Sequence, residues 1–108
     1  MAINRGEVWW VDFDPSTGSE IKKIRPAVVV SVNSANQALR RVQVVPLTTN
    51  VSRLYPGECL VLVADKQSKA MTDQIRTIDK VRCGERLATL SPVDVLKLDD
   101  ALRVQLGL

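Results

Sequence analysis

The side chains available for chemistry in this sequence are hydroxyls, carboxylates, lysines and arginines, because histidine is absent. Cys59 and Cys83 do not form a Cys-x-x-Cys pair, so neither a zinc site nor a disulfide scaffold is indicated, and both thiols are expected to be buried or partly buried. No phosphate-binding glycine loop, Gly-x-Ser-x-Gly elbow, His-Glu-x-x-His motif or dinucleotide fingerprint is present. Known catalytic and nucleotide-binding motifs therefore do not identify a reaction for this sequence.

Positive charge is concentrated in the middle of the chain. The sequence carries a formal net charge of +3, but residues 21–86 hold twelve Lys/Arg against five Asp/Glu, a local +7. Residues 1–20 carry −3 and residues 87–108 carry −1. The middle segment is where a polyanion would bind. The alternative is an ordinary solvated surface, since these bases need not share one face.

Short strands and one terminal helix must position these side chains. The run 27–32 is apolar almost throughout, which favours a strand buried on both faces at the centre of a sheet. Polar loops over 16–23 and 48–50 separate the strands, and a short helical turn is expected over 34–38. The other strand predictions are 8–13, 41–47, 58–63 and 85–90, with an extended segment over 70–78.

The C-terminal helix has the clearest start and stop signals. Ser91 is expected as its N-cap, Pro92 at the first helical position, and Asp94 in the first turn, where a carboxylate suits the positive helix end. Gly107 follows as a stop signal. The apolar face expected to pack on the sheet consists of Val95, Leu98, Leu102 and Leu106.

The order of elements lacks the alternation of strands and helices that a doubly wound parallel sheet requires. With 108 residues, 45% of them hydrophobic, and no linker or internal repeat, the chain predicts a single domain over 1–108. The expected fold class is α+β, mainly β: a small, curved, antiparallel barrel with a C-terminal α-helix. No stretch approaches the ~18 apolar residues of a membrane span, so we expect a cytoplasmic protein with no membrane partner.

Several motifs in series resemble the MazF/PemK/Kid family of toxins. The first group comprises Arg5-Gly6-Glu7-Val8-Trp9, Asp12-Phe13-Asp14-Pro15, Gly18-Ser19-Glu20 and Arg25-Pro26-Ala27-Val28-Val29-Val30-Ser31. Two later motifs are Pro46-Leu47-Thr48-Thr49 and Asp73-Gln74-Ile75-Arg76-Thr77-Ile78-Asp79-Lys80, in the family's order and at its spacing. Each motif is weak alone, whereas the series covers nearly the whole chain and is highly specific.

The resemblance implies an SH3-like barrel of the CcdB/PemK type, a homodimer, and sequence-selective cleavage of single-stranded messenger RNA that inhibits translation and growth. The expected products carry 2′,3′-cyclic phosphate and 5′-hydroxyl ends. No metal or other cofactor is expected, because the sequence lacks His and any carboxylate cluster suited to Mg²⁺. The resemblance also implies a MazE-like antitoxin whose C-terminal segment occupies the RNA site, and an antitoxin complex that binds operator DNA.

The resemblance assigns the catalytic set to Arg25, Thr48 and Glu20. Metal-free cleavage by the ribose 2′-OH requires alignment, two proton transfers and stabilisation of a dianionic pentacoordinate state, and without His a two-imidazole solution is excluded. The forked guanidinium of Arg25 suits charge stabilisation. The Thr48 hydroxyl donates to a phosphate oxygen, or else bonds its own backbone in a turn. Glu20 accepts the 2′-OH proton, or else is a loop carboxylate in water.

A second set of residues is expected to bind RNA around this centre. Asp73 matches an acid of the family's Asp-Gln signature that belongs to the catalytic set in the Kid branch, but Ser19 and Met71 stand where Kid-like members have His and Arg. A structural role for Asp73 near a strand end is therefore an equal alternative. Gln74 and Arg76 either contact RNA or tie down the sheet. The other residues expected to rim the site are Gly18, Ser19, Lys22, Lys23, Thr49, Asn50, Ser52 and Arg53.

The sequence leaves alternatives open for the tryptophans and for the activity. Trp9 and Trp10 can stack on RNA bases, but core or dimer packing is favoured for each. Since neighbours in a strand point to opposite faces, at most one of the two fills the core. Two other activities compete with the ribonuclease. One is a CcdB-like gyrase poison, which shares the barrel but does not use Arg25 and Thr48, and the other is a nucleic-acid-binding module without turnover.

Overall fold

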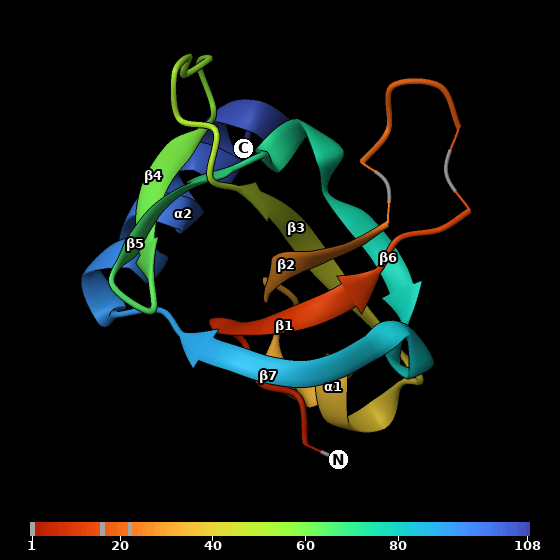
Figure 1. Cartoon of the computed structure of the whole chain (residues 1–108). Coiled ribbons are helices and arrows are strands. Elements are labelled where there is room, and N and C mark those ends of the chain that lie inside the picture. The colour runs from red at the N-terminus through yellow and green to blue at the C-terminus, as the bar shows by residue number, and fades with distance from the viewer. Residues whose placement is uncertain (1, 16, 22) are drawn as a thin grey trace.

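The strands form one curled antiparallel sheet that wraps into an open barrel and carries a helix on its outside (Figure 1). The computed structural model describes residues 2–15, 17–21 and 23–108, and the expected barrel with its C-terminal helix is confirmed. Within these residues the strand order is β4-β5-β3-β2-β1-β7, and β6 pairs with β3 beside this path. The elements are β1 (Glu7–Asp12), β2 (Ile24–Val29), α1 (Asn33–Ala38), β3 (Arg41–Thr48), β4 (Cys59–Val63), β5 (Lys66–Ala70), η1 (Thr72–Gln74), β6 (Arg76–Asp79), η2 (Lys80–Arg82), β7 (Cys83–Thr89) and α2 (Pro92–Leu106).

Strand β2 lies inside the sheet because its apolar run is covered on both faces. It pairs antiparallel with β1 on one edge and with β3 on the other. Ala27, Val28 and Val29 are all fully buried, which confirms the predicted central strand. The strand begins at Ile24 and ends before the predicted limit at 32, since Val32 is exposed and serves as the N-cap residue of α1.

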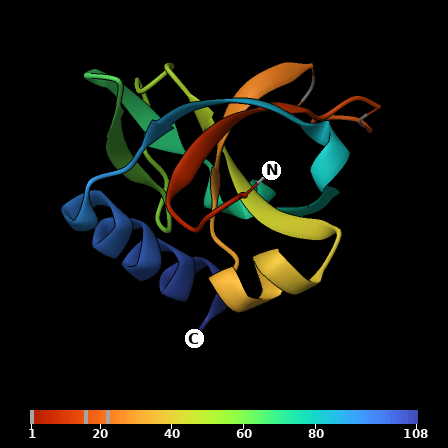
Figure 2. The ribbon, with the colours of Figure 1, turned by 90° about the horizontal axis from the view of Figure 1, so that it is seen from below.

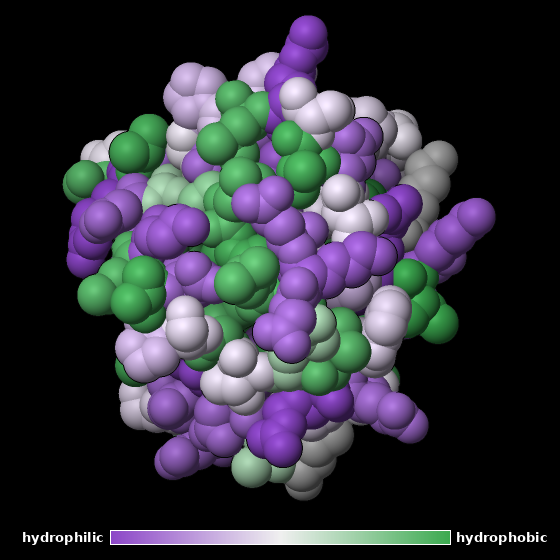
Figure 3. Space-filling view, turned by 60° about the vertical axis from the view of Figure 1, so that its left-hand side comes forward, coloured by the Kyte–Doolittle hydropathy of each residue, from purple (hydrophilic) through white to green (hydrophobic). Residues whose placement is uncertain are grey.

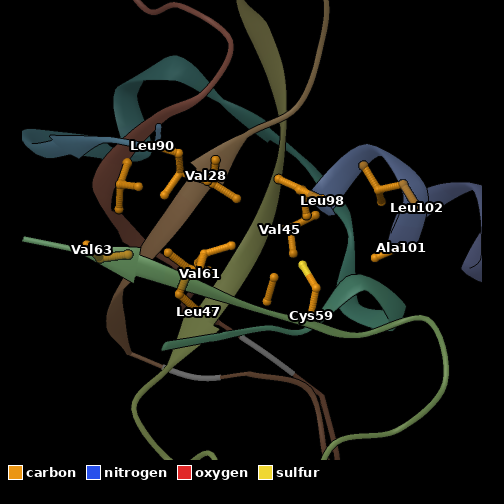
Figure 4. Packing of buried hydrophobic residues seen from close by; sticks show 12 residues of the cluster. Val28, Val45, Leu47, Cys59, Val61, Val63, Leu90, Leu98, Ala101 and Leu102 are labelled. Carbon is orange, nitrogen blue, oxygen red and sulfur yellow. The ribbon is translucent and has the colours of Figure 1, made fainter. Parts of the chain in front are cut away.

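The alternation of side chains across the sheet divides the interior into two cores. The helix-side core contains Val28, Val45 and Leu47 from the sheet together with Leu98 and Leu102 from α2 (Figure 4). Because successive residues of a strand point to opposite faces, Val28 of β2 packs in this core, whereas its neighbours Ala27 and Val29 pack in the other. The second core, called the barrel core below, consists of Ile3, Trp9, Val11, Phe13, Ala27, Val29, Val42, Val44, Ile78 and Cys83.

Both helices lie on the outside of the barrel, and their predicted ends are confirmed (Figure 2). The Ser91 hydroxyl accepts a hydrogen bond from the Asp94 backbone N–H at 3.1 Å, with Pro92 at the start of α2. Gly107 ends α2 with a left-handed φ of 69°, which a residue without a Cβ adopts at little cost. The helical turn predicted over 34–38 is α1.

The buried face of α2 differs from its prediction in the last turn. Leu98 and Leu102 are buried as expected, but Leu106 is exposed. Gln105 and Leu106 are both exposed, and the Gln105 side chain lies against Gly57 in the loop before β4. The buried stripe of α2 therefore ends at Ala101 and Leu102, one turn before its predicted end.

Strand β5 has no counterpart among the sequence predictions. Its outward residues are polar, and its buried residues, Ser68 and Ala70, are too small to give a β-branched or aromatic signal. The extended segment predicted over 70–78 is also wrong in part, because the 3₁₀ helix η1 interrupts it between β5 and β6. The other predicted strands are confirmed, with ends shifted by one or two residues.

The two tryptophans point to opposite faces of β1, as the strand alternation predicts. Trp9 is 6% exposed and belongs to the barrel core, so core packing is confirmed for this residue. Trp10 is 38% exposed and lines a pocket on the other face together with Ile24 and Val81. For Trp10, both predicted roles, packing in a dimer interface and stacking on an RNA base, stay predictions.

The two cysteines are buried in different cores, as expected for thiols that serve packing. Cys59 lies in the helix-side core and Cys83 in the barrel core. Burial raises the pKa of both thiols, and that of Cys83 reaches about 11. Both thiols are therefore neutral near pH 7.

The outer face of α2 also carries apolar side chains. Val93, Leu96 and Val104 of α2 are exposed, and so is Leu62 on β4. Figure 3, which brings the side with β4 and β5 forward, shows hydrophobic residues gathered between hydrophilic ones. Among the described residues, every helix is too short or too polar to cross a membrane.

A buried carboxylate joins the N-terminal segment to β1 and β7. The Glu7 carboxylate accepts hydrogen bonds from the Asn4 backbone N–H at 2.7 Å and from Trp9 Nε1 at 3.2 Å, and it pairs with Arg86 at 3.0 Å. Burial raises the pKa of Glu7, but the hydrogen bonds from Asn4, Arg86 and Trp9 outweigh that effect and hold this pKa below its ordinary value of 4.5. The folded state therefore favours the ionised carboxylate.

Replacing Glu7 by Gln should lower the free energy of unfolding by about 1–3 kcal/mol at pH 7, the usual contribution of hydrogen bonds to a charged group. Because the pKa of Glu7 is lowered on folding, this contribution is present above about pH 4.5 and is lost as the pH falls through the folded-state pKa. Urea denaturation of parent and variant between pH 7 and pH 3.5 measures the difference. The exposed Glu85→Gln should match the parent, and a Glu7→Gln difference that does not shrink at low pH would contradict this account.

Candidate active site

The register of β2 and β3 brings Arg25 and Thr48 to one end of the sheet. Ala27 pairs with Pro46, so Arg25 lies two residues before this pair on β2 and Thr48 two residues beyond it on β3. Residues two apart in a strand share a face, so both belong to the face of Ala27, which lines the barrel core. Both residues are half-buried. Two predicted catalytic residues that are distant in sequence therefore share one face and one end of the β2–β3 pair.

The loop between β1 and β2 is anchored at its base by two arginines. Arg76 on β6 donates from Nη1 to the carbonyl oxygen of Phe13 at 3.1 Å, and its guanidinium lies 5.8 Å from the centroid of the Phe13 ring. Arg82 donates to the carbonyl oxygens of Asp12, at 3.0 Å, and of Asp14. Arg76 therefore ties the base of this loop to β6, while its predicted contact with RNA stays a prediction.

Gln74 anchors the far side of the same loop. Its Oε1 atom accepts a hydrogen bond from the Ile21 backbone N–H at 2.7 Å, and Ile21 packs against the barrel core. A pocket of about 240 Å³ lies between the loop and the segment formed by η1 and the start of β6, and its lining residues are Ser19, Glu20, Ile21, Asp73, Gln74, Ile75 and Arg76. The Gly-Ser-Glu and Asp-Gln motifs, more than fifty positions apart in the sequence, therefore build one pocket.

The tip of this loop presents polar groups to solvent. Gly18, Ser19 and Glu20 are exposed, and Lys23 is exposed where the loop returns to β2. The Oε1 atom of Glu20 accepts a hydrogen bond from the Thr17 backbone N–H at 2.6 Å, which closes the turn. Glu20 is therefore exposed at the edge of the pocket, a position open to either of its two predicted roles. Lys22, predicted to bind RNA, lies outside the described residues.

The loop after β3 starts with a hydrogen-bonded turn at Thr48. The Thr48 hydroxyl oxygen accepts from the Asn50 backbone N–H at 3.2 Å, which is the turn role weighed for this residue. The hydroxyl can still donate its own proton to a phosphate oxygen. The Asn50 side chain accepts from the Ser52 hydroxyl at 2.8 Å, and Thr49, Asn50 and Ser52 are all exposed. These polar groups lie directly beside Thr48 in the chain.

Sequence reasoning did not place Lys69 and Tyr55 near the site. Lys69 is the register partner of Thr48 across the β3–β5 pair. Its Nζ atom lies 5.7 Å from the centroid of the Tyr55 ring, and the Arg53 guanidinium lies 5.7 Å from the same centroid. Because β5 is polar and its pairing with β3 is non-local, the sequence carried no signal that would join these residues to Thr48.

Guanidinium, hydroxyl and carboxylate groups thus surround one end of the barrel core. A guanidinium binds two phosphate oxygens at once, and a hydroxyl donates a single hydrogen bond to a third. Within residues 2–15, 17–21 and 23–108, no three His, Cys, Asp or Glu side chains group in a way that could hold a metal ion. The side chains at this end suit the binding of a phosphodiester and the stabilisation of added negative charge on it.

Comparison with known families decides the relationship of this chain. A family model described as the PemK-like, MazF-like toxin of type II toxin-antitoxin systems matches residues 4–106. The chain belongs to the PemK/MazF toxin family. The resemblance inferred from the sequence motifs is therefore confirmed.

Individual relatives of this toxin agree with the family match. Endoribonuclease MazF9 from Mycobacterium tuberculosis is 37% identical, over 98% of this chain and 98% of its own length. A crystal structure of MazF from Deinococcus radiodurans matches with a TM-score of 0.87 at 25% identity, over 100% of this chain and 99% of that one. An endoribonuclease from a mycobacterial species, solved in complex with its cognate antitoxin, matches with a TM-score of 0.84 at 29% identity, over 99% and 97%. The barrel with a C-terminal helix is thus the fold of solved MazF toxins.

Replacing Gln74 by Ala should release the β1–β2 loop of this toxin, because the Ile21 N–H loses its acceptor. Gln74→Glu replaces the amide oxygen by a carboxylate oxygen, which also accepts a hydrogen bond, and should retain the loop. Hydrogen–deuterium exchange of peptides covering residues 17–23 measures the effect. We expect exchange about fivefold faster in Gln74→Ala, which corresponds to the net contribution of one hydrogen bond. Equal exchange in both variants and the parent would show that the contact does not hold the loop.

Proposed function

We propose that this chain is the toxin of a type II toxin–antitoxin system and that it cleaves single-stranded messenger RNA. The observation that carries the proposal is the shared face of Arg25 and Thr48 at one end of the β2–β3 pair. The relatives named as endoribonucleases support it. The excess of positive charge over residues 21–86 supports a polyanionic substrate, and cleavage of messenger RNA would inhibit translation and growth.

Cleavage proceeds by attack of the ribose 2′-oxygen on the adjacent phosphorus. The O2′–P bond forms and the P–O5′ bond breaks, leaving a 2′,3′-cyclic phosphate on one fragment and a 5′-hydroxyl on the other. Arg25 stabilises the extra charge of the pentacoordinate state through its forked donors. Thr48 donates its hydroxyl proton to a non-bridging phosphate oxygen, while its own oxygen accepts from Asn50.

Two protons move during this reaction, one from the 2′-OH and one to the departing 5′-oxygen. Glu20 takes the first, in line with its solvated position at the edge of the pocket. Asp73, exposed on the opposite wall, lies within the same pocket and contributes to RNA binding. A water molecule in this open site supplies the second proton. The chemistry requires no metal or other cofactor.

The RNA follows the rim formed by the two loops. The β1–β2 loop and the loop after β3 supply cations, hydroxyls and amides that bind phosphates and fix the strand's direction. Gln74 and Arg76 anchor the first of these loops and contact the RNA from the pocket wall. The remaining RNA-binding residues are Gly18, Ser19, Lys22, Lys23, Thr49, Asn50, Ser52 and Arg53.

The proposal includes the partners implied by the family. A MazE-like antitoxin with an acidic, disordered tail binds the same positive rim and competes with RNA. A structural neighbour solved with its cognate antitoxin supports such a partner. The toxin acts as a single domain within a homodimer in the cytoplasm, where messenger RNA is found, and its antitoxin complex binds operator DNA. A CcdB-like gyrase poison is the alternative activity, and endoribonuclease names among relatives of this toxin weigh against it.

The ribonuclease should not depend on divalent metal ions, because Arg25 and Thr48 supply the positive charge and hydrogen bonding that Mg²⁺ provides elsewhere. A long RNA transcript should be cut equally well with and without excess EDTA. The fragments should be labelled by polynucleotide kinase without prior phosphatase treatment, since their 5′ ends carry hydroxyls. Loss of cleavage in EDTA, with recovery when Mg²⁺ is added, would contradict this mechanism.

Arg25→Ala and Thr48→Ala should each lower the cleavage rate by about 10²–10³, the usual cost of removing one transition-state donor. Arg25→Lys should recover only part of the rate, because a point charge cannot form the fork. Rates on the same transcript, with circular dichroism to check the fold, provide the measurement. The exposed Arg40→Ala serves as the control and should cleave like the parent. Parent-like rates in both active-site Ala variants would mean that the site lies elsewhere.

A further inference from the structure

Tyr55 is a large, exposed aromatic side chain close to Lys69, the register partner of Thr48. It is 52% exposed, in the loop that joins β3 to β4. The Arg53 guanidinium donates from Nη1 to the Tyr55 hydroxyl oxygen at 3.1 Å and lies 5.7 Å from the ring centroid. Lys69 Nζ lies over the ring at the same 5.7 Å from its centroid. An exposed ring with two cations close to it combines the two features that bind single-stranded RNA, a stacking surface and positive charge.

The Tyr55 ring is held in place by a lysine that is almost buried. The side chain of Lys69 is 11% exposed and that of Glu58 is 6% exposed, and their charged atoms lie 3.4 Å apart. Lys69 Nζ also donates to the carbonyl oxygen of Arg53 at 3.0 Å, and Glu58 Oε1 accepts from the Tyr55 backbone N–H at 2.8 Å. The ion pair of Lys69 and Glu58 therefore binds the backbone at Arg53 and at Tyr55.

The end of this loop is fixed as well. Gly57 has a positive φ of 84°, a conformation that favours glycine, and a Cβ added there would lie 3.0 Å from the end of the Gln105 side chain. The carbonyl oxygen of Gly57 accepts a hydrogen bond from the Thr72 hydroxyl. The loop that carries Tyr55 is thus attached to β5, η1 and α2, which limits the movement of the ring.

Strand pairing places this ring on the same side of the sheet as the candidate active site. Lys69 pairs with Thr48, while the neighbouring pair of Leu47 and Ala70 faces the helix-side core. Because alternate pairs face opposite sides, Thr48 and Lys69 share the face of the barrel core, to which Arg25 also belongs. In Figure 1, the loop after β3 and the β1–β2 loop both rise at the top of the barrel.

We propose that Tyr55 is a nucleotide-binding residue on which a base of the RNA stacks, one step along the strand from the phosphate bound at Thr48. Lys69 and Glu58 are positioning residues that hold the ring, and Arg53 binds the phosphate next to the stacked base. This proposal rests on the proposed ribonuclease function. Stacking is tolerant of base identity, so Tyr55 contributes affinity rather than sequence preference.

The test uses the purified full-length chain and an RNA oligonucleotide built around a cleavage site that the parent protein makes in a long transcript. Tyr55→Ala should raise KM about 5- to 100-fold, the range found when a stacking aromatic is removed, with little change in kcat or in the positions cut. Tyr55→Phe should behave like the parent because it keeps the ring. Tyr55→Leu keeps apolar bulk without a π face and should resemble Tyr55→Ala. The matched control is Leu54→Ala, which changes an exposed residue of the same loop and should leave KM unchanged.

Binding of the same oligonucleotide with a 2′-deoxy sugar at the cleavage site separates affinity from chemistry. Its dissociation constant should rise in Tyr55→Ala and Tyr55→Leu as KM does, while melting temperatures confirm that the variants fold. Lys69→Met should raise KM similarly and Lys69→Arg should not, since an arginine can still pair with Glu58. Parent-like KM and affinity in Tyr55→Ala, or in Tyr55→Leu, would overturn stacking while leaving the ribonuclease intact. A parent protein that cuts no RNA would instead overturn the proposed function, and the stacking proposal with it.

Discussion

The burial of β2 on both faces is the constraint on which the rest of the structure depends. Val28 fills the helix-side core while Ala27 and Val29 fill the barrel core, so a shift of one residue would exchange every side chain between them. Such a shift is costly because two cores, rather than one, would be repacked. The register that satisfies both cores also sets the face of Arg25, and through the pairing with β3 it sets the face of Thr48.

The site depends equally on how its two loops are held. The β1–β2 loop is attached through main-chain atoms, with Arg76 and Arg82 on its carbonyl oxygens and Gln74 on the Ile21 N–H. The loop after β3 is attached through the ion pair of Lys69 and Glu58. Main-chain attachment leaves the side chains at the loop tips available to a ligand. Rigid loops of this kind reduce the conformational entropy lost on binding RNA.

The sequence predicted those parts of the fold whose signals are local. The cap residues Ser91 and Gly107 have this property, and both were found where expected. The apolar run of β2 was correctly predicted as a central strand, although the strand ends at Val29 rather than at residue 32. The pairing of β3 with β5 is non-local and polar, so neither β5 nor the position of Lys69 beside Thr48 was predictable. Leu106 was wrongly predicted to be buried, because helical periodicity alone cannot tell which residue of the last turn lies against Gly57. The candidate catalytic residues were identified by family resemblance, since their grouping depends on sheet register.

The most direct test of this account is a crystal structure of the toxin with an RNA that carries a 2′-deoxy sugar at the cleavage site. The central claim is that Arg25 and Thr48 bind the scissile phosphate together. The account predicts this phosphate within hydrogen-bonding distance, about 2.7–3.2 Å, of both the Arg25 guanidinium and the Thr48 hydroxyl. An RNA bound on the outer face of α2, or a scissile phosphate that contacts neither side chain, would contradict it.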